Sequence, residues 1–103
     1  MAFGVIEYNA VSKSVMGRVF LLLDSLDDPG VSVSYKDGVI TADVKGVGTY
    51  VVNRQPPKKE IWLSSPISGP HHFQLKNNKW TNRSDQSLFS ILSSELALQD
   101  SIE

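Results

Sequence analysis

The order of amphipathic segments along the chain is the feature that most constrains its fold. From residue 31 to residue 81, apolar and polar side chains alternate, and turn sequences interrupt the alternation at short intervals. Alternation with a period of two is typical of strands that bury one face. Consecutive strands with short turns pair as antiparallel neighbours. The apolar face of such a sheet must be covered, and the segments on either side of the block can cover it.

Both flanking segments are predicted to be helices, over residues 5–26 and 87–98. Each repeats apolar side chains every three or four residues, which is the spacing of one helical face. The predicted stripes are Tyr8, Val11, Val15, Val19, Leu22 and Leu26 in the first helix, and Leu88, Ile91, Leu92 and Leu96 in the second. Ser87 is a suitable N-cap for the second helix, with Asp85 as the alternative.

Six strands are predicted between the helices. Their expected bounds are 31–36, 40–44, 48–54, 59–64, 71–76 and a short 79–81. Asp37–Gly38 is a tight hairpin signal, and Pro56–Pro57 ends the third strand. The expected fold is therefore α+β, a two-layer α/β sandwich with two helices on one face of a five- to six-stranded antiparallel sheet. We expect one domain over residues 1–103, ordered from about residue 5 to residue 98.

Composition narrows the chemistry that this chain can perform. It has no cysteine, so disulfides, thiolate metal sites and cysteine nucleophiles are excluded. The longest apolar run, residues 19–23, is far shorter than the roughly 20 residues that cross a bilayer, so no membrane association is expected. Charge is uneven along the chain, because residues 45–83 carry seven Lys and Arg but one acid.

Strand phase predicts which side chains lie on the uncovered face of the sheet. In the fourth strand Ile61 and Leu63 belong with the helices, so Trp62 points to the open face. Asn53 and Gln55 in the third strand are expected to point the same way. An outward tryptophan favours a binding surface, because tryptophan is enriched among binding hot spots. The alternative is that neighbouring side chains half-cover Trp62 and that it stabilises the sheet. The other tryptophan, at position 80, is predicted to lie in the core.

Residues 48–73, GTYVVNRQPPKKEIWLSSPISGPHHF, resemble the signature region of the frataxin family, including its bacterial homologues. The family pattern there is G-T-Y-V-x-N-x-Q, a short Pro/Lys loop, and I-W-L-S-S-P-x-S-G-P. Through the order of elements the resemblance covers about residues 5–98. It is specific at the level of motifs from residue 48 to residue 83.

The resemblance implies a frataxin-like protein of iron–sulfur cluster assembly. Such a protein docks on the complex of a cysteine desulfurase and an iron–sulfur scaffold and regulates cluster formation. It also binds iron, Fe²⁺ or Fe³⁺, weakly and labilely through carboxylates. The alternative is an iron chaperone, donor or store in which metal chemistry dominates. Frataxins are non-enzymatic, although weak ferroxidase activity is left open. We expect a monomer that can form oligomers with iron.

The resemblance also assigns partner-binding residues. They are Asn53, Arg54, Gln55, Glu60, Trp62, Ser64, Pro66, Gly69, Pro70 and His72. The Gly/Pro/Ser loop over residues 64–70 lies beside the open face and is a natural docking edge. The predicted location is the bacterial cytoplasm, because Met1 lies just before the first helix. The mitochondrial matrix is the alternative for a processed organellar chain.

Four acids are candidate iron ligands, namely Glu7, Asp24, Asp27 and Asp28. The family normally carries a dense ridge of carboxylates on its first helix, but here Lys13 and Arg18 stand in its middle. Carboxylates at a helix C-terminus are disfavoured by the helix dipole. The three aspartates therefore indicate either a solvated turn or a weak metal site.

Two further possibilities are disfavoured by the sequence. His71 and His72 are adjacent in a predicted strand, so they point to opposite faces and cannot readily chelate one ion. No serine–histidine–acid pattern is visible along the chain. A nucleic-acid module would need several aromatic stacking platforms, and one outward aromatic is expected, so we predict no nucleic-acid partner.

Overall fold

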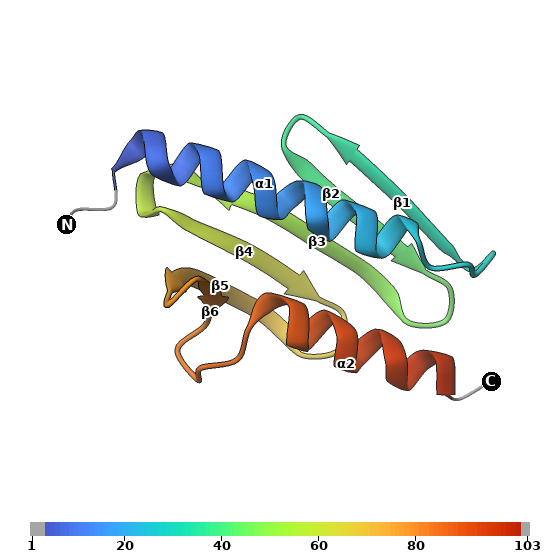
Figure 1. The fold of residues 1–103 in the computed structure, drawn as a ribbon. Helices are drawn as coiled ribbons and strands as arrows, with labels where there is room; N and C mark the ends of the chain where they lie inside the picture. Colours follow the sequence, from blue (N-terminus) through green and yellow to red (C-terminus); the bar gives the residue numbers. More distant parts are fainter. Residues whose placement is uncertain (1–3, 102–103) are drawn as a thin grey trace.

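The computed structural model describes residues 4–101 of the chain, with side chains up to residue 96. Helix α1 (Val5–Asp24) precedes six strands, and helix α2 (Leu88–Ser101) follows them. The strands are β1 (Val31–Lys36), β2 (Val39–Val44), β3 (Gly48–Gln55), β4 (Glu60–Ser65), β5 (Gly69–Lys76) and β6 (Lys79–Thr81). They pair antiparallel in the order of the chain, and both helices lie over the same face of the sheet (Figure 1). The predicted two-layer fold is confirmed.

Turn chemistry explains why the strands follow one another so closely. At Asp37–Gly38 both residues have positive φ, 51° and 76°, and at Asn77–Asn78 the values are 51° and 64°. Positive φ at both central positions is typical of the type I′ turn, whose twist matches that of the strands it joins. Between β3 and β4 the chain forms the short 3₁₀ helix η1 (Pro56–Lys58). The hairpin signal at Asp37–Gly38 is therefore confirmed.

The ends of the helices differ from the predicted bounds. Helix α1 ends at Asp24 rather than at residue 26, because Asp28 and Pro29 begin a turn in which the Asp28 carboxylate accepts the N–H of Gly30 at 2.8 Å. Helix α2 continues past residue 98 to Ser101. The Oγ of Ser87 accepts the N–H of Ser90 at 3.1 Å, so Ser87 caps α2 as predicted. Neither helix within the described residues is long and apolar enough to cross a bilayer.

The buried face of α1 also differs from the predicted stripe. Val11 is 36% exposed, and Leu22 and Leu26 are half-buried at the edge of the core. The residues that are buried are Tyr8, Ser12, Val15, Met16, Val19 and Leu23. Both sets fit a helical period, so spacing alone could not choose between them. One long-range contact shows which face of α1 is directed at the sheet. The Tyr8 hydroxyl donates to the carbonyl of Glu60 in β4 at 2.7 Å.

The core lies between the helices and the inner face of the sheet. Its members come from both helices and from every strand except β1, whose Val31 and Val33 pack against it half-buried. Trp80 is 5% exposed and meets the Tyr8 ring edge-to-face at 6.2 Å, so its prediction as a core residue is confirmed. The buried aromatic pair joins α1 to the short last strand.

One carboxylate is buried where the two layers meet. Glu95 of α2 is 8% exposed, and its Oε1 accepts hydroxyl protons from Tyr50 in β3 at 2.9 Å and Ser65 in β4 at 2.6 Å. A third hydroxyl, that of Ser68 in the loop between β4 and β5, also donates to it. Hydrogen bonds to a charged acceptor are stronger than neutral ones. Glu95 therefore ties α2 to two strands and to the loop that joins β4 and β5.

Replacing Glu95 tests how much this carboxylate contributes to the free energy of unfolding. We expect Glu95→Ala to lower the free energy of unfolding by about 3 kcal/mol, because it removes three charge-assisted hydrogen bonds from a buried place. Glu95→Gln should cost about half as much, because its amide can still bond the hydroxyl groups. Urea unfolding followed by circular dichroism measures both. Ser94→Ala, on the exposed side of the same helix, is the control, and a Glu95→Ala variant as stable as that control would contradict the assignment.

Candidate functional site

The uncovered face of the sheet carries one row of side chains across five strands. The strand register places Lys36, Val39, Asn53, Trp62 and His72 opposite one another from β1 to β5. Residues that face each other in this way point to the same side of a sheet. The neighbours of Trp62 in β4, Ile61 and Leu63, are buried under the helices. Strand phase therefore predicted the face of Trp62 and Asn53 correctly.

Trp62 is held in place by its neighbours on this face. The ring of His72 stacks on it, with 4.1 Å between centroids and 12° between planes. The indole Nε1 donates to a carboxylate oxygen of Glu60 at 2.8 Å, and Gln74 donates to the other oxygen at 3.1 Å. Trp62 is half-buried as a result, so the suggestion that neighbours half-cover it is confirmed. The stack and the hydrogen bond restrict the rotamer of the ring.

The loop between β4 and β5 has a defined shape beside this face. Ser65 Oγ accepts the N–H groups of Ile67 and Ser68, both at 3.0 Å. Pro66 packs against Gly48 at the start of β3, where a Cβ would lie 2.6 Å from the proline ring and φ is +137°. Glycine is needed there because of both the close approach and the backbone conformation. The signature glycine and proline thus fit together in space.

The remaining predicted partner residues lie around the row. Ser64 and Pro70 face each other across β4 and β5 and are exposed on the open side. Gln55 and Glu60 face each other at the end of β3 next to η1. Gly69 pairs with Ser65 at the loop, where its φ is +85°. The structure therefore brings most of the predicted set onto one face and the loop beside it.

Arg54 is the exception in this set. It pairs with the buried residue Ile61, so it points toward the helices and away from Asn53 and Gln55. Its guanidinium donates to the side-chain oxygen of Asn9 at 3.2 Å and lies 5.6 Å from the centre of the Tyr8 ring. The structure places Arg54 in the contact between β3 and α1.

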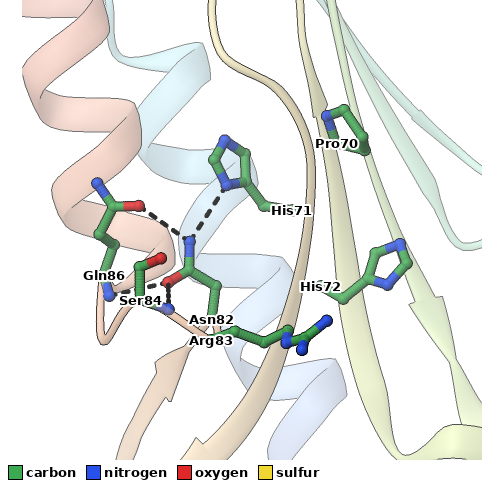
Figure 2. Close-up of a pocket in the computed structure, with 7 residues that line it drawn as sticks. All are labelled: Pro70, His71, His72, Asn82, Arg83, Ser84 and Gln86. Carbon is green, nitrogen blue, oxygen red and sulfur yellow. Dashed lines mark hydrogen bonds between the residues drawn. The ribbon is translucent and has the colours of Figure 1, made fainter.

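His71 and His72 lie on opposite sides of β5, as predicted (Figure 2). His71 takes part in a network that no sequence pattern indicated, because Asn82 and Glu95 join it from other parts of the chain. Its Nε2 lies 2.7 Å from Ser68 Oγ, and its Nδ1 lies 3.2 Å from the side-chain nitrogen of Asn82. If Asn82 donates to Nδ1, the ring proton is on Nε2 and is donated to Ser68, whose own proton goes to Glu95. In that arrangement His71 cannot act as a base toward Ser68, so the network fixes the loop.

The four candidate iron ligands are not all close together. Glu7 and Asp24 are 17 residues apart in α1, which corresponds to about 25 Å along the helix. Asp27 and Asp28 follow the end of the helix, where one oxygen of Asp28 already accepts the N–H of Gly30. Among the described residues, no group of three or more His, Cys, Asp or Glu is placed to hold a metal ion. Any site near Asp24 would therefore use few protein ligands.

These features define a two-layer α/β sandwich with one uncovered sheet face. Two helices cover one side of a six-stranded antiparallel sheet, and a polar row around a tryptophan lies on the other. The family model described as the frataxin-like domain matches residues 2–101. The chain belongs to the frataxin-like family.

Named relatives give the same assignment. The chain is 44% identical over 85 residues to the mitochondrial frataxin homolog of Saccharomyces cerevisiae, and 44% identical over 99 residues to that of Schizosaccharomyces pombe. These matches cover 73% and 89% of this chain, and they span 48% and 63% of the length of the two relatives.

Solved structures of yeast frataxin have the same fold. The trimeric protein with its full-length N-terminus superposes with a TM-score of 0.78 at 36% identity, covering 84% of this chain and 76% of that one. Trimeric yeast frataxin complexed with ferrous superposes with a TM-score of 0.69 at 33% identity, covering 94% and 86%.

Replacing each tryptophan compares the stability that Trp62 contributes on the sheet surface with the stability that Trp80 contributes in the core. We expect Trp62→Ala to fold cooperatively and to lose about 1–2 kcal/mol of unfolding free energy, because its ring is half-buried. Trp80→Ala should lose about 3–5 kcal/mol, because it opens a cavity in the core. Urea unfolding of both variants gives the comparison. If Trp62→Ala loses as much stability as Trp80→Ala, Trp62 is a structural residue.

Proposed function

We propose that this protein docks through the open face of its sheet on the complex of a cysteine desulfurase and an iron–sulfur scaffold, and that it regulates cluster formation there. Frataxins act in iron–sulfur cluster assembly and iron binding and are generally non-catalytic. The observation that carries the proposal is the row centred on Trp62, with Asn53 on one side and His72 on the other. A large aromatic side chain amid polar neighbours is typical of a binding hot spot.

The geometry of Trp62 favours binding by a preorganised surface. Its ring is already fixed by the His72 stack and by the hydrogen bond to Glu60. A side chain that is ordered before binding loses little further rotamer freedom when a partner covers it. The adjoining loop is likewise fixed, through Ser65 and Glu95. The docking surface that we propose therefore consists of the row and the loop beside it.

Three alanine variants give a sharp test of this surface. Trp62 and Asn53 lie on the open face, whereas Arg54, the neighbour of Asn53 in β3, points toward α1. We expect Trp62→Ala to weaken binding to the purified desulfurase–scaffold complex at least tenfold, and Asn53→Ala to weaken it severalfold, because both lie on the open face. Arg54→Ala should bind like wild type, because its side chain contacts α1. Isothermal titration calorimetry gives the dissociation constants. Wild-type affinity of both Trp62→Ala and Asn53→Ala would overturn the docking model.

The compartment and the oligomeric state form a further part of the proposal. Both relatives described above are named as mitochondrial proteins. This favours the mitochondrial matrix, the alternative raised by the sequence, over a bacterial cytoplasm. The yeast structures are trimeric, whereas we propose a monomer that assembles when iron is bound.

Iron binding is proposed as a weak second property. Ferrous is bound in the yeast structure, and this chain carries three carboxylates, those of Asp24, Asp27 and Asp28, within five residues at the end of α1. Hard cations are held by several such ligands. These residues fit a labile site better than a store, because one of the three carboxylates is already used within its own turn. Docking is therefore the primary function, and iron storage or donation is the secondary candidate.

A titration with Fe²⁺ followed by NMR under anaerobic conditions tests the iron proposal. The amide signals of residues 24–28 should broaden first, because paramagnetic iron relaxes the nearest nuclei most strongly. The double variant Asp24→Asn with Asp27→Asn should lose this broadening. Glu7→Gln, at the other end of α1, serves as the control and should retain it. If residues 24–28 stay sharp in the wild-type protein, the iron proposal is wrong and the docking proposal is unaffected.

A further inference from the structure

We infer that the open face also carries a carboxylate-binding hollow beside Trp62, formed by Lys58, Lys76 and Arg83, which receives an acidic side chain of the docking partner. The inference rests on the proposed docking function. It adds the chemistry of the partner surface, which neither the sequence pattern nor the row around Trp62 specifies.

The hollow lies where η1, the strands β4 to β6 and the segment after β6 meet. Its volume is about 370 Å³, and its lining includes Lys58, Glu60, His72, Lys76 and Arg83. A second hollow of about 300 Å³ shares His72, Asn82 and Arg83 with it. In Figure 2 the Arg83 side chain extends from the segment after β6 toward the side of β5 that carries His72. Because His72 stacks on Trp62, the hollow adjoins the proposed hot spot.

The charges around the hollow are not balanced by the side chains that the structure describes. Lys58, Lys76 and Arg83 are exposed, and none of them forms an ion pair with the side chains described up to residue 96. Lys76 stands directly opposite Lys79 in the β5–β6 hairpin, and like charges in that position disfavour the pairing. An anion would relieve this repulsion.

The single acid at the hollow does little to offset these cations. Both oxygens of Glu60 already accept hydrogen bonds, from the indole of Trp62 and from the amide of Gln74. Its position is set by the tryptophan, so it cannot turn freely toward the lysines. The hollow keeps an excess of positive charge next to an apolar ring.

This combination fits a protein carboxylate. A guanidinium forms two parallel hydrogen bonds to a carboxylate, and ammonium groups add attraction without demanding a fixed geometry. A metal ion would be repelled by the cations. A nucleic acid would need further aromatic platforms, and within the described residues the open face offers Trp62 with one side already covered by His72. A partner segment that covers Trp62 would place its next side chains over the hollow.

Charge reversal tests the inference. We expect Arg83→Glu and Lys76→Glu each to weaken binding to the purified desulfurase–scaffold complex at least tenfold in low salt, and to reduce the dependence of the dissociation constant on salt. Lys45→Glu is the matched control, because it makes the same charge change in an exposed turn at the other end of β3. It should alter binding less than twofold. Glu60→Gln removes the one negative charge and should tighten binding severalfold.

The outcomes separate this inference from the docking proposal. If Trp62→Ala weakens binding while Arg83→Glu and Lys76→Glu behave like Lys45→Glu, docking stands and the carboxylate hollow is wrong. Equal weakening by all three reversals would show long-range attraction and would also overturn it. Weakening by Glu60→Gln would also count against the hollow, because the variant removes a negative charge and keeps a carbonyl oxygen that can accept the indole N–H of Trp62. If the reversals at the hollow weaken binding and Trp62→Ala does not, the hollow is supported and the hot spot is refuted.

Discussion

The buried carboxylate of Glu95 is the interaction on which the arrangement of the rest depends. It lies on α2, yet its three hydroxyl donors come from β3, β4 and the loop between β4 and β5. A buried charge is costly unless it is fully hydrogen-bonded. Here the donors arise from three separate parts of the chain, so the charge is compensated when helix, sheet and loop are all in their native places. The signature loop acquires its shape from the layer behind it.

The same division into layers accounts for the open face. Because both helices cover one side of the sheet, the other side keeps its side chains available to a partner. On that side Trp62 is supported by Glu60 and His72, while the loop is supported by Ser65 and Glu95. The surface is thus built from side chains that neighbouring residues hold in place. Such a surface suits the docking role proposed above.

Periodicity and turn residues predicted most of the fold. The alternation of Ile61, Trp62 and Leu63 determined which face each of them occupies, because the period of a strand is fixed by its backbone. Asp37–Gly38 and Ser87 marked a hairpin and a helix start through local hydrogen-bond and φ requirements. The buried stripe of α1 was less well predicted. Several stripes satisfy a period near 3.6, and the choice among them was made by long-range contacts such as the one from Tyr8 to β4.

For the candidate site as well, local features could be predicted from the sequence and long-range contacts could not. The sequence by itself determined the order of strands, the outward direction of Trp62 and Asn53, and the motif that assigns the family, because each of these depends on local spacing. The tertiary structure alone decided that Arg54 points to the helices and that Glu95 holds the loop. It also gathered Lys58, Lys76 and Arg83 around one hollow. Those outcomes depend on contacts between residues that are distant in the chain, and no local pattern encodes which distant partners the packing of two layers will bring together.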